Sequence, residues 1–346
     1  MIRKVFFLAT VAIALSMIVA GAGYAKTFNF SLAHFWPGGH VLETQLVADW
    51  AKAINEATDG RVTITSYPGG TLISGGETYE GVVQGVADFG ISAYAYTRGR
   101  FPVVESFLLP GIGYNTSKAA SAALMEGLEK LDPQEIKDTK HIFSFSTGPG
   151  HLMMTGKRVT SMADMRGLTI GATAGPRADA VSNLGATPVI MPMPEWYEAL
   201  SRGIMQGGIA PLEVLEGFRL GEVTADSITM TPFLYSQHFF LVMNLGKWNA
   251  LPPDLQQIIE TVSADQFENN VKGLWDGINA RGVAWTEEKK AVEIIRLPPD
   301  EEALWIKAVE PIMDEHKKFL ESRGLDGDLI LKTVKELADK HNALYE

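Results

Sequence analysis

Residues Pro252–Lys290 read PPDLQQIIETVSADQFENNVKGLWDGINARGVAWTEEKK, with no proline after Pro253. Apolar residues recur in this stretch near helical spacing, which predicts one amphipathic helix. They are Leu255, Ile258, Ile259, Val262, Phe267, Val271, Leu274, Trp275 and Ile278. A helix of about 37 residues measures about 55 Å, which exceeds the width of one domain of this chain's size. We therefore expect residues 252–285 to form a helix that crosses two domains. Three glycines are points at which it would bend: Gly273, Gly277 and Gly282.

The residues before this helix alternate between strand and helix patterns in two series. The first series consists of a buried strand, an amphipathic helix, an alternating strand, a helix and a third strand. These are Phe28–His34, Val41–Thr58, Arg61–Tyr67, Gly76–Ala87 and Asp88–Ala95. That order predicts a parallel sheet with right-handed crossovers. A second series runs from His141 to Leu245, without a sequence repeat between the two.

The predicted fold class is therefore α/β with two domains. Domain I is expected at residues 26–147 plus about 232–250, and domain II at residues 148–231 plus about 286–346. The two domains together have about 320 residues, enough to bury a core without disulfides, and the chain contains no cysteine.

The N-terminus has the pattern of a secretory signal peptide. Arg3 and Lys4 are followed by an apolar run from Val5 to Ala20, and Gly23-Tyr24-Ala25 is a small-x-small cleavage signal. The apolar run is short for an uncleaved membrane anchor, which needs about 20 residues. We expect cleavage near Ala25 and export to the periplasm.

The charge balance excludes nucleic acid as a partner. The net charge is −11 over 346 residues, and without residues 1–25 the balance is 28 basic against 41 acidic residues. Binding to phosphate backbones needs a basic surface.

No catalytic or metal-binding motif stands out, and no cofactor is expected. The sequence lacks G-x-S-x-G, H-E-x-x-H and a P-loop. His34 and His40 could form half of a metal site, but their spacing fits no helix face and no acidic or cysteine partner accompanies them. The glycine-rich Gly148–His151 is explained as well by a tight turn as by a phosphate site.

Two loops that follow predicted strands carry candidate ligand-binding residues. In open α/β sheets, ligands bind beyond the carboxyl ends of strands. Phe35 and Trp36 directly follow the first strand, together with His34. The loop after the third strand contributes further candidates, which are Tyr94, Tyr96, Arg98 and Arg100. A two-domain α/β protein with such loops and no catalytic set fits a binding protein that closes by hinge motion.

Several ordered motifs resemble the extracytoplasmic solute receptors of TRAP (tripartite ATP-independent periplasmic) transporters, of the DctP-like type. They read ADMRGLTI, LGATPVIMPMPEWYEALSRGIMQGG, LVMNLGKWNALPPDLQQII, TDGRVTITSYPGGTL and GVADFGISAYAYTRGRFPVVESFLLPG. The resemblance covers nearly the whole chain after residue 25. It implies a type II-like periplasmic-binding-protein fold in which a long helix crosses both domains. It also implies a receptor, not an enzyme, that captures a small organic solute, usually an acid. The receptor would deliver that solute to a small and a large membrane subunit.

The chain departs from the family pattern at the polar contacts of the pocket. Family members read GLKIRV where this chain reads GLTIGA, so the arginine that pairs with a ligand carboxylate falls on Gly171. A second family arginine falls on His151, a family asparagine on Ala210 and a pocket aromatic on Met193. A polar pocket residue falls near His238. Gly171 would leave space where a side chain is usual, which favours a larger or differently oriented ligand.

Three accounts of ligand binding remain open. In the first, Arg177 reaches back over the flexible turn GATAGP and replaces the lost arginine. In the second, histidines hold the anion together with Arg98 or Arg100; the candidates are His151, His34 and His238. In the third, the ligand has little anionic character and an apolar or aromatic body binds to Phe35, Trp36, Met193 and Trp196, since a buried unpaired carboxylate is very costly.

Other classes of protein would differ from this reading in identifiable features. An ABC-type receptor would lack the crossing helix, a periplasmic enzyme would need a catalytic set in the cleft, and a sensor module would act on a membrane kinase. The sequence names neither the ligand nor the oligomeric state.

Overall fold

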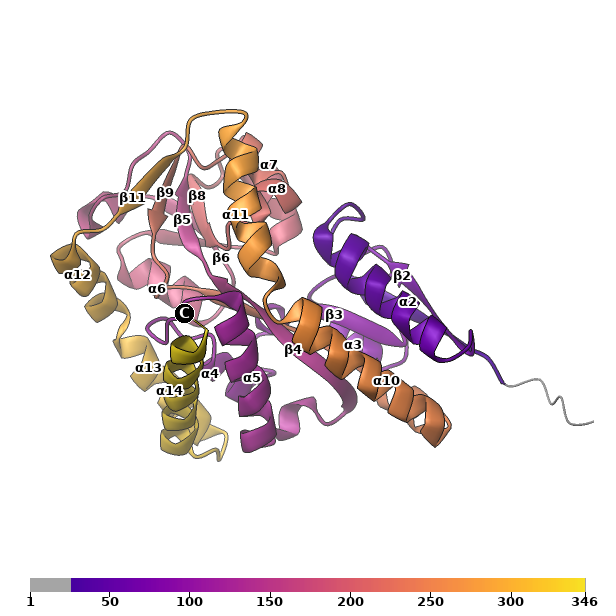
Figure 1. The fold of residues 1–346 in the computed structure, drawn as a ribbon. Coiled ribbons are helices and arrows are strands. Elements are labelled where there is room, and N and C mark those ends of the chain that lie inside the picture. The colour runs from indigo at the N-terminus through magenta and orange to yellow at the C-terminus, as the bar shows by residue number, and fades with distance from the viewer. Residues whose placement is uncertain (1–25, 346) are drawn as a thin grey trace, which may run out of the picture.

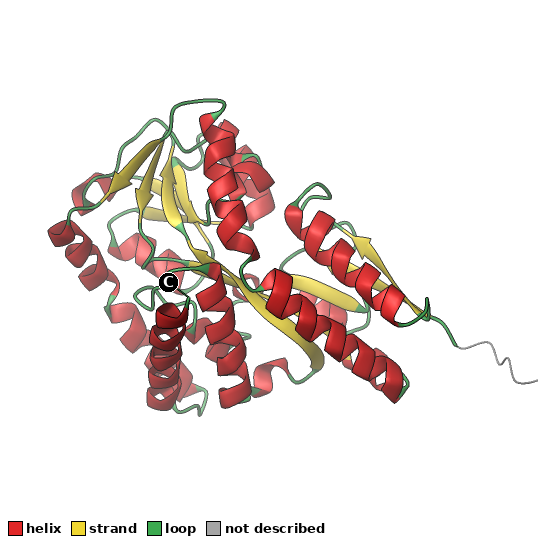
Figure 2. Ribbon diagram, in the orientation of Figure 1, coloured by secondary structure: helices red, strands yellow, loops and turns green. Residues whose placement is uncertain are grey.

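The structure is a computed structural model that describes residues 26–345, so the predicted signal peptide at residues 1–25 lies outside it. Two mixed sheets form two α/β domains (Figures 1 and 2). The first sheet has the order β2-β1-β3-β10-β4 and the second the order β11-β9-β5-β8-β6-β7. This confirms the predicted α/β class with two domains.

The strands of the first sheet are β1 Phe28–His34, β2 Val62–Tyr67, β3 Phe89–Ala93, β4 Thr139–Pro149 and β10 Ser236–Asn244. Those of the second are β5 His151–Met154, β6 Thr169–Ala172, β7 Thr187–Ile190, β8 Gly207–Ala210, β9 Ser227–Met230 and β11 Glu293–Arg296.

The α-helices are α2 Ala48–Ala57, α3 Thr78–Val83, α4 Pro102–Ser106, α5 Ser117–Leu131, α6 Pro176–Asn183, α7 Trp196–Ser201, α8 Val214–Gly217, α9 Leu245–Asn249, α10 Pro253–Gln266, α11 Leu274–Glu287, α12 Pro299–Val309, α13 Pro311–Ser322 and α14 Gly327–Leu344. Short 3₁₀ or π turns occupy Leu42–Val47, Tyr94–Tyr96, Gln134–Ile136, Met162–Met165, Met193–Glu195, Leu220–Glu222 and Phe267–Val271.

The three strands of the first series, β1, β2 and β3, are parallel, as their β-α-β order predicted. Each complete sheet is nevertheless mixed. In the first sheet β10 runs antiparallel to β3 and β4, and in the second β5 runs antiparallel to β8 and β9. These are the strands at which the chain enters the other domain: β4 continues into β5, and β9 leads to β10. The two crossings lie side by side, since the Gly150 N–H donates to the Tyr235 carbonyl at 2.9 Å. Two adjacent connections of this kind are suited to act as a hinge.

The predicted crossing helix is present, but it is not continuous. It consists of α10, a π-helical turn at Phe267–Val271 and α11, with Gly273 out of helical conformation between them. Helix α10 packs against α2 and β4, whereas α11 packs mainly against α8, so the segment contacts both domains (Figure 1). The break falls at one of the three glycines named as bending points.

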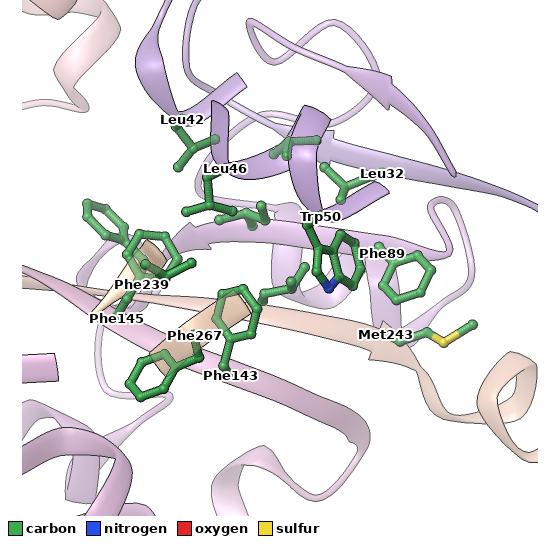
Figure 3. Close-up of a cluster of buried hydrophobic side chains, with 14 of the residues drawn as sticks. Leu32, Leu42, Leu46, Trp50, Phe89, Phe143, Phe145, Phe239, Met243 and Phe267 are labelled. Atoms are coloured by element: carbon green, nitrogen blue, oxygen red, sulfur yellow. The ribbon is translucent and has the colours of Figure 1, made fainter. Parts of the chain in front are cut away.

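The first domain is held by a large apolar cluster between its sheet and the helices α2 and α10 (Figure 3). Trp50 of α2 is completely buried there and its indole N–H donates to the Ser263 hydroxyl of α10 at 2.9 Å. Phe145 and Phe239 extend this cluster to Trp275, where α11 begins, with ring centroids 5.2 and 5.7 Å from the Trp275 ring. The crossing segment is therefore anchored in the first domain's core.

The C-terminal helix packs differently from our expectation. Residues 286–346 were assigned to domain II, but α14 lies along α5 of the first domain (Figure 1). Its apolar residues Ile330, Val334 and Leu337 join the cluster on the other face of the first sheet. That assignment was therefore wrong for α14, because its apolar stripe has its partner on α5. Only β11 and α12 of this region pack wholly with the second sheet and its helices.

Buried histidines make the stability of this fold dependent on pH. Burial lowers the pKa of His141, His151 and His316 to about 4, that of His238 to about 3, and that of His34 as well. Below pH 6.5 the unfolded chain binds protons at these sites that the folded protein does not, so stability falls as the pH falls. Burial raises the pKa of Glu135 to about 7, and also raises that of Glu105, which opposes this trend.

We expect the free energy of unfolding to fall by roughly 3 to 6 kcal/mol between pH 7 and pH 5, because each of the four most strongly shifted histidines contributes about 2 kcal/mol and the two carboxyl groups offset part of the sum. Urea unfolding at the two pH values measures it. A His316→Gln variant should show a smaller pH dependence. Equal stability at both pH values would contradict the prediction.

Candidate functional site: a closed cavity between the domains

A cavity lies between the two sheets and is lined by both domains. Most of its lining residues come from strand ends or from the loops that directly follow strands, where ligands bind in α/β proteins. They are Phe35, Trp36, Tyr96, Thr147, Thr173, Met191, Met193, Trp196, Ile209, Pro211, Glu213, Val214, Phe218, Tyr235, Gln237 and Phe239. The free volume of the cavity is about 20 Å³, room for roughly one water molecule, so side chains nearly fill the cleft in this closed form.

Aromatic rings from the first domain form one wall of the cavity. Phe35 and Trp36 are stacked with centroids 3.8 Å apart, and both are nearly completely buried. Trp36 meets Phe239 edge-on at 4.8 Å, and Phe35 contacts Tyr96 at 5.1 Å. Phe218 of the second domain lies 6.5 Å from Phe35, so the aromatic surface continues across the domain boundary. Such a surface binds flat apolar groups well.

Two hydrogen bonds across the cleft show that the domains are closed. The backbone N–H of Met193 in the second domain donates to the Tyr96 hydroxyl of the first at 3.1 Å. His40 of the first domain donates from Nε2 to Glu213 of the second at 2.9 Å, and this pair is buried. Opening of the hinge would break both bonds.

The position of the missing family arginine is filled by another side chain. A Cβ atom added at Gly171 would lie 2.7 Å from Met205 Sδ and 3.0 Å from the indole of Trp196. At Gly208, on the neighbouring strand, an added Cβ would lie 2.2 Å from the same indole. Trp196 therefore lies over both glycines, held by a hydrogen bond from its Nε1 to the Met191 carbonyl at 3.1 Å. Our expectation that Gly171 leaves free space for a larger ligand was wrong, because this indole occupies the space.

Arg177 of α6 is buried at the wall of the cavity, with 4% of its surface exposed. Its Nη1 donates to the Thr173 hydroxyl, and its guanidinium lies over the Tyr235 ring, 4.7 Å from the centroid. Both of these neighbours line the cavity. Nε and Nη2 have no hydrogen-bond partner among the described residues, and burial lowers the pKa of the guanidinium. The charge of Glu105 acts favourably on this guanidinium, but the effect of burial is larger and no hydrogen bond joins the two groups. Nε and Nη2 are therefore free to donate to an anionic ligand.

The candidate histidines all have structural partners. His34 Nε2 lies 2.7 Å from Glu43 Oε2 and outside the cavity lining. His151 Nδ1 accepts from the Thr231 N–H, and His238 Nε2 contacts the Phe107 carbonyl. The lowered pKa values of His151 and His238 keep both rings neutral, so they carry no positive charge for an anion. Ala210 lies opposite His151 in the second sheet, at a fully buried position.

The loop after β3 contributes one tyrosine, but not the other candidates. The Tyr94 hydroxyl pairs with Ser144 at 2.7 Å inside the first domain, whereas Tyr96 lines the cavity. Arg100 binds the Glu135 carbonyl and pairs with Asp138. Arg98 is exposed and does not line the cavity.

Sequence reasoning missed the cavity residues contributed by the interdomain crossings. Thr147 lies near the end of β4, while Tyr235, Gln237 and Phe239 follow in the return crossing. The Gln237 N–H donates to the Thr147 hydroxyl at 3.2 Å, and Gln237 Oε1 is buried without a partner among the described residues. The dense polar and aromatic pattern of residues 231–239 was the available signal.

No group of three or more His, Cys, Asp or Glu residues within 26–345 could hold a metal ion. Over the same residues, no helix combines the length and apolar character needed to span a bilayer.

Comparisons with known proteins agree with this architecture. Residues 32–319 match the family model DctP, described as bacterial extracellular solute-binding protein, family 7. A TRAP solute-binding protein from Rhodoferax ferrireducens, crystallised with copurified benzoate, has 26% identity and a TM-score of 0.85, covering 92% of this chain and 100% of that one. A marine metagenome TRAP protein in complex with 3-hydroxybenzoate has 27% identity and a TM-score of 0.86, with coverage of 91% and 99%. A TRAP periplasmic protein from Desulfovibrio salexigens has 31% identity and a TM-score of 0.80, with coverage of 92% and 98%.

Proposed function

The chain belongs to family 7 of the bacterial extracellular solute-binding proteins, and from this premise we propose that it is a TRAP receptor for a small aromatic carboxylate. The family and its structural neighbours are solute-binding receptors and not enzymes, as the resemblance had implied. In this proposal residues 1–25 direct export, and the remaining chain works in the periplasm. The loaded receptor then delivers its ligand to the small and large membrane subunits.

The unpaired guanidinium of Arg177 beside the aromatic cavity is the observation that supports this ligand class. A carboxylate could accept hydrogen bonds from Nε and Nη2, which would pair the buried charge. The ring of the ligand would then lie among Phe35, Trp36 and Phe239. This combines the first and third accounts derived from the sequence, since the cation and the aromatic surface belong to one site. The neutral histidines argue against the second account.

Two relatives support an aromatic acid in particular. The Rhodoferax protein was crystallised with benzoate and the metagenome protein with 3-hydroxybenzoate. Both cover more than nine tenths of this chain. The aromatic side chains of the cavity suit the ring of such a ligand, and the neighbouring Arg177 guanidinium suits its carboxylate.

Closure of the two domains would enclose the ligand. The bonds Tyr96–Met193 and His40–Glu213 join the domains on the two sides of the cleft. Binding would proceed in an open form, and the aromatic acid would add contacts to both domains when the hinge closes. Release of the ligand, with entry of water into the cavity, would then require the hinge to open again.

Calorimetric titration of the protein without residues 1–25 tests the proposal. Benzoate should bind, whereas benzamide, which has the same shape without the charge, and succinate, which has charge without a ring, should bind at least tenfold more weakly. In thermal unfolding, benzoate at a hundredfold excess over its Kd should stabilise the protein by about 2.7 kcal/mol. Equal binding of benzoate and benzamide, or binding of succinate alone, would overturn the proposed ligand class.

A further inference from the structure

A second charged group, Glu213, lines the same cavity. It lies between β8 and α8, and its side chain is 5% exposed. Thr173 and Tyr235, which contact Arg177, and Glu213 are all part of the lining. The cavity therefore has an anionic group in addition to the guanidinium at its wall.

Glu213 is held in place by both domains. His40 Nδ1 accepts the Leu42 N–H at 3.0 Å, so the proton of the neutral ring is on Nε2, and Nε2 donates to Glu213 Oε2. The backbone N–H of Glu213 donates to Asn279 Oδ1 at 3.0 Å. The side-chain amide of Asn279 in turn donates to the Thr147 carbonyl at 3.1 Å. The backbone and one carboxylate oxygen of Glu213 are thus held in place. The residue also lines a second hollow beside His40 and Gly217.

One carboxylate oxygen is left for another donor. Oε2 accepts from His40, and Oε1 forms no hydrogen bond with any described residue. Arg177 contacts the Tyr235 ring, which lines the cavity together with Glu213, and the charges of both groups act on the Tyr235 hydroxyl. An acid without a donor group would bring its own negative charge near Glu213 and offer no hydrogen bond to Oε1. Both effects disfavour binding.

We infer that the bound acid carries, besides its carboxylate, a hydrogen-bond donor (an O–H or N–H group) that Glu213 accepts. This rests on the proposed function and narrows it to a bipolar ligand, in which Arg177 pairs with the carboxylate and Glu213 with the donor. Glu213 then selects hydroxylated or aminated aromatic acids over unsubstituted ones.

Matched ligands test the inference by calorimetry on the protein without residues 1–25. Each ring position of benzoate is examined as the hydroxy, amino and methoxy derivative, because the methoxy group is similar in shape to the hydroxyl and has no donor. At one position the hydroxy or amino acid should bind 10- to 100-fold more tightly than the methoxy acid, the range expected for a hydrogen bond to a charged group. The two donor series show whether an O–H or an N–H group is preferred.

Glu213→Gln should remove most of this preference and at the same time tighten the binding of unsubstituted benzoate, because the repulsion is gone. Glutamine can still accept from His40, so the variant should fold, which thermal unfolding without ligand checks. Glu216→Gln is the matched control on the same segment, since Glu216 pairs with Arg281 at 2.7 Å and does not line the cavity. This control should keep the preference for the donor.

Three results would overturn the inference, and they are distinguishable. If donor and methoxy acids bind equally at every position while benzoate binds, the receptor function stands and the role of Glu213 fails. If the preference survives in Glu213→Gln, another group recognises the donor. If no aromatic acid binds at all, the proposed function fails and this inference fails with it.

Discussion

An Arg177→Met variant is expected to bind benzoate at least a hundredfold more weakly than the natural protein. The guanidinium is buried, and two of its nitrogens have no partner among the described residues. Removing one partner of a buried ion pair costs about 3–5 kcal/mol, which corresponds to a factor of roughly 10² to 4 × 10³ in affinity. Calorimetric titration measures the loss, with Arg98→Met as the control at an exposed arginine that does not line the cavity.

The stability of the ligand-free variant separates this role from a structural one. A buried and unpaired charge destabilises the protein that contains it, so Arg177→Met should unfold at the same temperature as the natural protein or at a higher one. Its binding of neutral benzamide should be retained. If the variant kept full affinity for benzoate, the anion would be held elsewhere and our assignment of the charged partner would be wrong.

A Gly171→Arg variant, which restores the family residue, is expected to lose about 3 kcal/mol or more of stability. The new side chain would begin 2.7 Å from Met205 Sδ and 3.0 Å from the Trp196 indole, and overpacking of a core costs about 1–3 kcal/mol even for smaller additions. Urea unfolding measures the change. Gly277→Arg is the control, because nothing lies within 4 Å of a Cβ atom added there.

A double variant shows whether Trp196 is the cause. Trp196→Ala alone should cost about 3–5 kcal/mol, as expected for a buried tryptophan. Combined with Gly171→Arg, the total loss should be smaller than the sum of the two single losses by more than about 1 kcal/mol, because the arginine can enter the space that the indole vacates. Additive losses would mean that the indole does not block this position.

The crossing helix shows how far the sequence predicts the fold. The apolar spacing of residues 252–285 and the length of the segment were enough to predict an element that contacts both domains, and Gly273 was among the predicted bending points. The direction of β5 and β10 was not predictable in the same way. Periodicity reports which face of a strand is buried and contains no information on which neighbour it pairs with.

The site was predictable where a residue directly follows a strand. Phe35 and Trp36 were found because parallel strands end at the edge of the sheet where ligands bind. Tyr94 and Tyr96 were both candidates, and only the second lines the cavity. The 3₁₀ turn at Tyr94–Tyr96 rotates successive side chains by about 120°, so residues two apart point in different directions.

By itself, the sequence determined the α/β class, the two-domain organisation, the crossing segment and the aromatic character of the loops after the strands. These depend on spacing and residue type within short stretches of chain. Only the tertiary structure decided that Trp196 covers Gly171, that α14 returns to the first domain, and that Glu213 lines the cavity whose residues Thr173 and Tyr235 contact Arg177. Each of these results from contacts between residues far apart in the chain, and such contacts are set by packing and by the burial of charge, which no local pattern records.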